Sequence, residues 1–256
     1  MFIPDANILQ PLIDVANAVL KFFHDNVGLS WGMSIIAITV CTRALLIPLT
    51  YKQLKGMRAM QALQPQIKEL QEKYKNDKQR MQQEMMRFYK ENKVNPFASC
   101  IPLLAQLPVF ITLFYTLRHE LPDDICSNLG LPNGCDTAGH ASFLFVNDLT
   151  ASPHGAELIA LIVLYVGTQL ASGFFMSVTA DKSQRMMMFI LPLVFVPFVI
   201  NFPAGLIVYW ITTNIWTIGQ GLVINKVIPA PVVASKAEVQ AAKPPPKSPK
   251  KKKRRR

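Results

Sequence analysis

The chain has 256 residues, of which 50% are hydrophobic and only 17% are charged, well below the roughly 25% of charged residues in average soluble domains. The formal net charge of +11 arises from 27 Lys and Arg against 16 Asp and Glu, and the basic residues are gathered into blocks. This composition excludes an evenly solvated globular protein. The four cysteines form no CxxC motif, which argues against a zinc ribbon.

The first segment, residues 1–27, predicts an external amphipathic helix that lies in the membrane interface. Apolar residues recur at helical spacing from Ile8 to Phe23, and polar residues such as Asp14 and Lys21 lie opposite them. An ordinary surface helix is the alternative. Because the first charges are acidic and no small-residue cleavage site follows, a signal peptide is not expected.

Five segments are long and apolar enough to cross a hydrocarbon layer, which takes about 20 mostly apolar residues. The predicted spans are residues 28–50, 97–117, 158–178, 186–202 and 203–225. Pro102 and Pro108 interrupt the second span, but prolines are tolerated where neighbouring helices satisfy the freed backbone groups. The predicted fold class is therefore an all-α integral membrane protein with five transmembrane helices.

The connecting segments differ sharply in charge. Residues 51–96 and the tail 226–256 each contain eleven Lys and Arg, and the connection 179–185 adds Lys182 and Arg185. Residues 118–157 have one basic residue, and the first 27 residues have Lys21 alone against three Asp. Because short cytoplasmic loops are enriched in Lys and Arg, we expect an external N-terminus and a cytoplasmic C-terminus.

The two basic cytoplasmic segments are different in kind. In residues 51–96, apolar side chains from Met60 to Phe88 repeat at intervals of three and four, so the pattern predicts a helical hairpin that turns at Asn76-Asp77. It would be either a spacer or a mobile arm that meets partners. The tail 226–256 is rich in Pro, Ala and Lys and predicts disorder. Its charges suit either anionic lipid or the phosphates of RNA.

Arg43 is the one charge in the middle of a predicted span, where a cation costs about 2.5–3.5 kcal/mol on insertion scales. No span contains an acid to pair with it. We therefore expect a hydrated cavity open towards the cytoplasm; an Arg that reaches the inner headgroups is the alternative. The polar residues predicted to share this cavity are Thr39, Gln106, Gln169, Trp210 and Asn214. Taken singly, each would also suit an interhelical hydrogen bond.

The sequence lacks the residues and motifs that several kinds of catalytic site require. The spans contain no His, Asp or Glu, and the chain has no HExxH, P-loop or GxGxxG motif. The sequence thus predicts a protein that is not an enzyme and needs no cofactor or metal. Cys126 and Cys135 lie in a predicted external segment, where they either form a disulfide or remain unpaired; the sequence leaves both possibilities open. Cys41 and Cys100 are expected to be small buried hydrophobic residues.

The motifs together resemble the YidC family of membrane protein insertases over residues 29–224. They are Thr39–Thr50 (TVCTRALLIPLT), Leu63-Gln64-Pro65, Asp77–Arg80 (DKQR), Gln83–Met86 (QEMM), Lys93–Pro96 (KVNP), Pro102-Leu103-Leu104, Pro203–Leu206 (PAGL) and Tyr209-Trp210 ahead of Asn214. The chain looks like a short five-span form of that family, and it has no lipobox cysteine near its start.

The resemblance implies an insertase of the bacterial plasma membrane. Arg43 and the polar residues above would line a groove that attracts a substrate's short polar tail. The apolar segment of the substrate would slide into lipid along a track of Phe110, Ile111, Phe114, Phe189, Val194 and Phe198. Implied partners are nascent membrane proteins, the ribosome through the hairpin and tail, the Sec translocon, the signal recognition particle machinery and anionic lipids. A membrane chaperone without translocation activity and an anion-selective facilitator are the rival functions.

Overall fold

The computed structural model describes residues 10–92, 94–95, 101–177 and 182–227. Its regular elements are helices, which confirms the predicted all-α class. They are α1 (Gln10–Lys21), a π-helical turn (Phe22–Asn26), α2 (Trp31–Leu45), α3 (Ile47–Ala62), α4 (Gln64–Lys73), α5 (Lys78–Glu91), α6 (Ile101–Tyr115), a second π-helical turn (Thr116–Glu120), α7 (Leu121–Asn128), α8 (Gly155–Ser177), α9 (Lys182–Val199) and α10 (Ala204–Val227).

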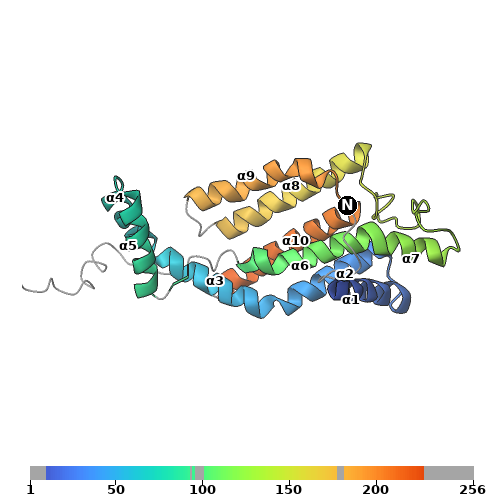
Figure 1. The fold of residues 1–256 in the computed structure, drawn as a ribbon, viewed down its shortest axis with the longest axis horizontal. Helices are drawn as coiled ribbons and strands as arrows, with labels where there is room; N and C mark the ends of the chain where they lie inside the picture. Colours follow the sequence, from blue (N-terminus) through green and yellow to red (C-terminus); the bar gives the residue numbers. More distant parts are fainter. Residues whose placement is uncertain (1–9, 93, 96–100, 178–181, 228–256) are drawn as a thin grey trace, which may run out of the picture.

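The longer helices form an elongated bundle (Figure 1). Helix α10 packs against α2 on one side and against α8 on the other, and α9 packs on α8. Helix α1 packs against both α2 and α6. The α4–α5 pair stands at one end of the molecule, beyond α3, and α7 continues α6 at the opposite end (Figure 1).

A tight turn folds α1 back onto α2. The His24 ring stacks on the Trp31 ring with centroids 3.7 Å apart, and His24 Nδ1 lies 2.7 Å from the Leu29 carbonyl oxygen. Gly28 has a φ of +78°, in the left-handed region where glycine has no steric cost. Ser30 then caps α2, because its side chain accepts from Met33 N. These contacts place the apolar face of α1 against the bundle.

The first predicted span is bent rather than straight. Helices α2 and α3 meet at Leu46 with an angle of 54°. Pro48, in the first turn of α3, has no N–H to donate to the carbonyl of Ala44, so the regular hydrogen-bond ladder cannot continue through it. The bend directs α3 away from the bundle and towards the α4–α5 pair (Figure 1).

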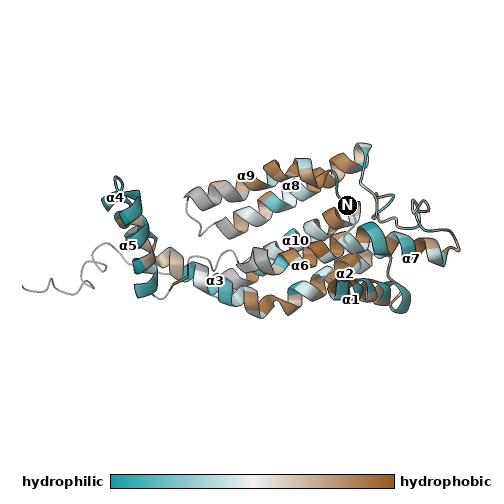
Figure 2. Ribbon diagram, in the orientation of Figure 1, coloured by the Kyte–Doolittle hydropathy of each residue, from teal (hydrophilic) through white to brown (hydrophobic). Residues whose placement is uncertain are grey.

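The α4–α5 pair is a helical hairpin. Pro65 lies in the first turn of α4, and Asp77 caps α5 by accepting from Arg80 N at 3.0 Å. Figure 2 shows both helices as mostly hydrophilic, unlike the bundle helices. On α5, Arg87 Nε donates to Glu91 at 2.9 Å across one helical turn, on an exposed face of the helix. The hairpin therefore presents a charged surface outside the apolar bundle.

The best-packed core lies at the α7 end of the bundle. Side chains from α2, the turn before α7, α7 itself, the loop between α7 and α8, and the start of α10 are fully buried there; among them are Ile35, Leu117, Leu121, Leu149 and Leu206. Elsewhere the bundle surface is apolar and open. Ile159 and Val163 on α8 are 66% and 64% exposed, and Val194 on α9 is 58% exposed. Apolar side chains at this density on an outer face suit contact with lipid.

Within the described residues, one helix is long and apolar enough to cross a membrane by itself, at Gly155–Phe175 in α8. The bent α2–α3 pair is also long and apolar enough if the two helices are counted as a single span. Helix α9 contributes a shorter apolar stretch, Phe189–Val199, and it begins at Lys182, inside the predicted 179–185 connection. Helix α10 is long but includes Asn214 and Gln220, which lower its hydropathy. The count of five spans therefore stays a prediction.

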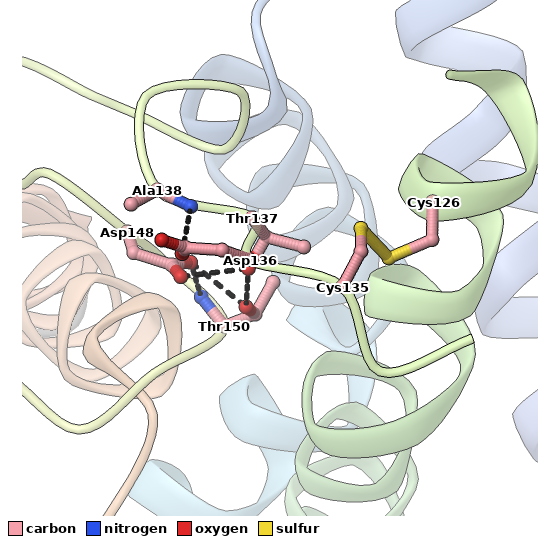
Figure 3. The surroundings of a disulfide bond; sticks show 7 residues. All are labelled: Cys126, Cys135, Asp136, Thr137, Ala138, Asp148 and Thr150. Atoms are coloured by element: carbon pink, nitrogen blue, oxygen red, sulfur yellow. Dashed lines mark hydrogen bonds between the residues drawn. A yellow bond between two sulfur atoms is a disulfide. The ribbon is translucent and has the colours of Figure 1, made fainter. Parts of the chain in front are cut away.

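Residues 118–154, here called the cap segment, are stapled by a disulfide. Cys126, near the end of α7, forms a disulfide with Cys135, nine residues later (Figure 3). The sequence alone left this disulfide open. Two residues after Cys135, Thr137 Oγ1 donates to Asp148 Oδ2 at 2.7 Å, and the Thr150 amide donates to Asp148 Oδ1 at 2.8 Å (Figure 3). The loop is thus held at both ends.

The cap segment also packs directly on the bundle. The amides of Ala204 and Gly205, at the start of α10, donate to the carbonyl oxygens of Ala151 and Leu149. The Phe143 ring lies against Gly32 of α2, so closely that a Cβ on this glycine would fall 2.1 Å from ring carbon Cγ. A side chain at Gly32 has no room, and the cap covers this end of the bundle.

Candidate functional site

Arg43 lies in the last turn of α2, one turn before the bend, and its side chain is partly buried. Among the described residues it has no carboxylate partner and donates no hydrogen bond; its electrostatic neighbour is the Tyr209 hydroxyl of α10. The negative end of the α2 dipole favours a cation at this position. The structure therefore places an unneutralised guanidinium on an otherwise apolar helix.

Thr39 is one turn before Arg43 and is almost fully buried. Its Oγ1 donates to the Ile35 carbonyl of its own helix at 2.6 Å, so the hydroxyl is already satisfied. The side chain lines a cavity shared with α1 and α6. Thr39 thus contributes a methyl surface next to Arg43 rather than a free hydroxyl.

Helix α10 presents two different polar faces. Trp210 and Asn214, both chosen from the sequence, face α8: Asn214 Nδ2 donates to Thr168 Oγ1 at 3.2 Å, and the Trp210 ring lies 5.6 Å from the Tyr165 ring. Tyr209 and Thr213 form the adjacent face, and Tyr209 interacts with Arg43. The two α10 residues predicted to line a cavity with Arg43 therefore share the face towards α8, whereas Tyr209, on the adjacent face, is the α10 residue that interacts with Arg43.

Tyr209 is the site residue that the sequence reasoning missed. It is 1% exposed and Thr213 is 8% exposed. The two side chains lie one helical turn apart and interact with each other, but within the part of the chain that the structure describes neither hydroxyl forms a well-aligned hydrogen bond. Buried polar atoms are normally satisfied, so the Tyr209 hydroxyl, which interacts with Arg43, leaves capacity for a polar guest. The spacing of four residues between Tyr209 and Thr213 was the signal that could have found this face.

Trp210 is the centre of an aromatic cluster rather than an isolated polar residue. Its ring centroid lies 5.1 Å from Phe110, 5.8 Å from Phe195 and 5.9 Å from Phe202, in addition to Tyr165. These rings come from α6, α8, α9 and the turn before α10. The cluster joins the helices that surround the proposed groove, and ring pairs at such distances each add about 0.5–1.5 kcal/mol.

The six residues of the predicted apolar track differ in exposure. Phe110 and Phe114 on α6 pack inward against the core and against the Phe202 ring, at 5.9 and 5.7 Å. Ile111 and Phe189 are partly buried, whereas Val194 and Phe198 are 58% and 59% exposed on α9. The surface available to a guest is therefore mainly the α9 face.

Gln106 on α6 and Gln169 on α8 are both partly buried. Across the described ranges, no hydrogen bond joins either amide to Arg43. Cys41, two residues before Arg43, is exposed, so its expected burial was wrong. It lines a cavity between α1, α2 and α6, and Tyr209 of α10 is also among the lining residues. Cys100 lies outside the described residues.

Residues 22–231 match the family model described as 60Kd inner membrane protein. A membrane protein insertase YidC from Streptomyces avermitilis is 36% identical over 245 residues, and one from Geobacter sulfurreducens is 38% identical over 211 residues. The chain belongs to the YidC family. It covers 56% and 36% of these two relatives, whose matches cover 85% and 82% of the chain, so it spans about half their length or less.

A solved YidC structure has the same fold. The crystal structure titled "Active YidC insertase crystal structure with the first transmembrane domain resolved" superposes with a TM-score of 0.63 at 23% identity, and the match covers 83% of this chain and 46% of that one. The family match begins at Phe22, after α1. Family membership places the chain among inner membrane proteins, and α1 lies ahead of the matched region.

Proposed function

We propose that the protein inserts newly made membrane proteins into the bacterial plasma membrane and helps them fold. The observation that carries this proposal is Arg43, which has no carboxylate partner among the described residues and lies partly buried in an apolar bundle near the buried Tyr209 hydroxyl. The relatives named as membrane protein insertases support it. The helices that hold Arg43 are within the family match.

Arg43 is the receptor for the polar tail of a substrate. A carboxylate about 4 Å from the guanidinium is attracted by about 4 kcal/mol at an effective dielectric constant near 20. This is several times the attraction in bulk water, so the cation lowers the cost of drawing an acidic tail out of water. Tyr209 and Thr213 supply further hydrogen bonds to that tail. Thr39, Gln106, Gln169, Trp210 and Asn214 complete the walls of the groove.

The hydrophobic segment of the substrate moves into lipid along the apolar track. Val194 and Phe198 on α9 receive it first because they are exposed, and Phe189 and Ile111 extend the surface. Phe110 and Phe114 support the track from behind through the aromatic cluster. Transfer of that segment from water into lipid supplies the free energy, at roughly 25 cal/mol per Å² of apolar surface, so no nucleotide or cofactor is required.

The protein crosses the membrane five times with its C-terminus in the cytoplasm. The basic segments 51–96, 179–185 and 226–256 then lie on the positive, cytoplasmic side. The disulfide in the cap segment supports an external position for residues 118–157, since disulfides persist in oxidising compartments. The dense core beneath the cap supports a groove that is closed at this end.

The hairpin and the basic tail recruit substrates. The charged face of α5 and the tail 226–256 approach the ribosome or anionic lipid, and the Sec translocon and the signal recognition particle machinery act beside the protein during synthesis. A chaperone that holds other spans without translocating their tails is the second candidate, because the exposed apolar face of α9 would suit it equally. An anion-selective facilitator would use Arg43 as its binding site.

Insertion into liposomes tests the proposal. The purified full chain is reconstituted, a single-span substrate with a short acidic tail is added, and protection of the tail from external protease is measured. We expect wild type to protect the tail and Arg43→Ala to lose most of this activity. Arg43→Lys, which keeps the charge, serves as the control and should retain activity.

The three functions give different results. If the liposomes bind the substrate but never protect its tail, the protein is a chaperone. If chloride leaks through the vesicles and no tail is protected, it is a facilitator. If Arg43→Ala protects the tail as well as wild type does, the cation has no part in insertion.

A further inference from the structure

The cap segment carries a short apolar turn on its surface. Phe143 and Val146 pair with each other through two backbone hydrogen bonds, each 2.8 Å from nitrogen to oxygen, so the chain reverses its direction at Leu144 and Phe145. Both residues of the turn are exposed, Leu144 at 84% and Phe145 at 46%. These two residues are here called the cap tip.

The backbone of the cap tip is strained. Leu144 has a φ of +54°, and among the residues that the structure describes it is the one non-glycine with a positive φ. A leucine adopts this left-handed conformation at an energetic cost, because its Cβ crowds the backbone, and Gly or Asn is the usual residue there. A strained leucine that is also exposed does not stabilise the turn by itself, which points to a contact outside the chain.

The base of the cap tip is fixed at one end of the bundle. Val146 is 2% exposed, and the Phe143 ring lies against Gly32 in the first turn of α2. Residues 28–50 are the predicted first span, so this contact puts the tip at the level where that span begins. Met33, beside Gly32 on α2, is 42% exposed. In a member of an inner membrane protein family, this level is the boundary between the headgroups and the hydrocarbon.

The size and chemistry of the cap tip suit lipid rather than a protein partner. A stable protein–protein interface takes about 20–30 residues on each side, and the tip offers two. Neither side chain is charged or has a hydrogen-bonding group, so nothing in the tip selects a headgroup. An aliphatic and an aromatic side chain held at the edge of the hydrocarbon gain by leaving water.

We propose that the cap tip inserts into the surface of the bilayer and anchors the cap segment to the membrane. Leu144 and Phe145 lie among the acyl chains just beneath the headgroups, and this transfer from water offsets the strained backbone of Leu144. The anchor holds the cap over its end of the bundle, together with the contact between Phe143 and Gly32. The proposal rests on the proposed span at residues 28–50, but neither on insertase activity nor on the side of the membrane that the cap faces.

Tryptophan fluorescence of the reconstituted full chain tests the proposal. Phe145→Trp adds an indole to the tip and keeps it aromatic, and the emission of wild type, which contains Trp31, Trp210 and Trp216, is subtracted. The vesicles contain phosphatidylcholine brominated either near the headgroup or near the methyl end of one acyl chain. We expect the added emission to be quenched most by bromine near the headgroup and little by iodide in the water.

Two control variants place this result on a scale. Val163→Trp, at a 64% exposed apolar position of α8, should be quenched by brominated lipid and not by iodide. Asn128→Trp, at the exposed last residue of α7, which leads away from the bundle (Figure 1), should be quenched by iodide and not by brominated lipid.

The outcomes separate this proposal from the membrane topology. If the indole at position 145 meets iodide while the one at position 163 meets bromine, the bundle is in the bilayer and the cap tip is not, which overturns the proposal. Shielding at position 145 from both quenchers overturns it too, because a protein surface then covers the tip. If neither position meets bromine, the proposed span fails together with the anchor.

A substitution at Leu144 tests its own part in the anchor. Asparagine tolerates the left-handed conformation, so Leu144→Asn keeps the turn and removes the apolar side chain. Combined with Phe145→Trp, it should lower quenching by brominated lipid and raise quenching by iodide, while the melting temperature stays the same or rises. Unchanged quenching by both agents would contradict the insertion of Leu144.

Discussion

Gly205 gives the sharpest test of how the cap segment is held. A Cβ built on this glycine would lie 2.9 Å from the Leu149 carbonyl oxygen, 3.0 Å from Ile35 Cδ1 and 3.1 Å from Leu117 Cδ1. Ordinary van der Waals contacts of a Cβ are 3.4–4 Å. In Gly205→Ala, the backbone of the cap and two core side chains would all have to move by several tenths of an ångström.

The expected cost follows from two opposing terms. Overpacking a well-packed core costs about 1–3 kcal/mol, and the higher helix propensity of alanine returns at most about 1 kcal/mol. The net loss of about 1–2 kcal/mol should lower the midpoint of thermal unfolding by roughly 2–8 °C. Circular dichroism of the purified chain in detergent measures it.

Gly219 provides the matched control on the same helix. A Cβ there would meet nothing within 4 Å, so Gly219→Ala causes no overpacking and changes only the helix propensity. The free energy of unfolding should therefore stay the same or rise by up to about 1 kcal/mol. The reasoning would be refuted if Gly205→Ala unfolded at the wild-type temperature or above while Gly219→Ala did not.

Two further predictions concern the cap segment. Asp124→Asn weakens the partly exposed ion pair with Lys21, so it should lower the free energy of unfolding by about 0.5–1 kcal/mol in low salt and leave the unfolding temperature unchanged in high salt. The control Asp123→Asn, at an exposed position, should have no effect. Equal unfolding temperatures of the wild type and both variants in low salt would contradict this prediction. Replacing Cys126 and Cys135 with serine should remove about 2–3 kcal/mol of loop constraint, measured as faster proteolysis of the cap; unchanged proteolysis would show that the hydrogen bonds alone hold it.

The helices could be predicted because their signals are local. The period of the apolar residues marks α4 and α5, and Asp77 ahead of the second helix marks its start. The bend at Leu46 was less accessible, since Pro48 by itself allows either a kinked continuous span or two helices. The disulfide was a possibility only, because sequence gives the cysteines but not whether the loop returns to α7.

The site was predicted in part, for a geometrical reason. Arg43 could be recognised from the sequence because a charge within an apolar stretch is evident without knowing which residues surround it. Assigning partners requires the rotation of each helix, and α10 has polar residues on two adjacent faces. The sequence favoured Trp210 and Asn214, whereas Tyr209 is the residue beside Arg43. Similarly, Phe110 was placed on an outer track, but its ring stacks on Trp210.

A charge swap tests the central claim, that Arg43 attracts the tail of the substrate, most directly. Tail protection is measured for one substrate with an acidic tail and for the same substrate with a lysine tail, each with wild type and with Arg43→Glu. We predict that wild type protects the acidic tail in preference to the lysine tail and that Arg43→Glu reverses this preference. The same order of preference in both proteins would contradict electrostatic capture by Arg43.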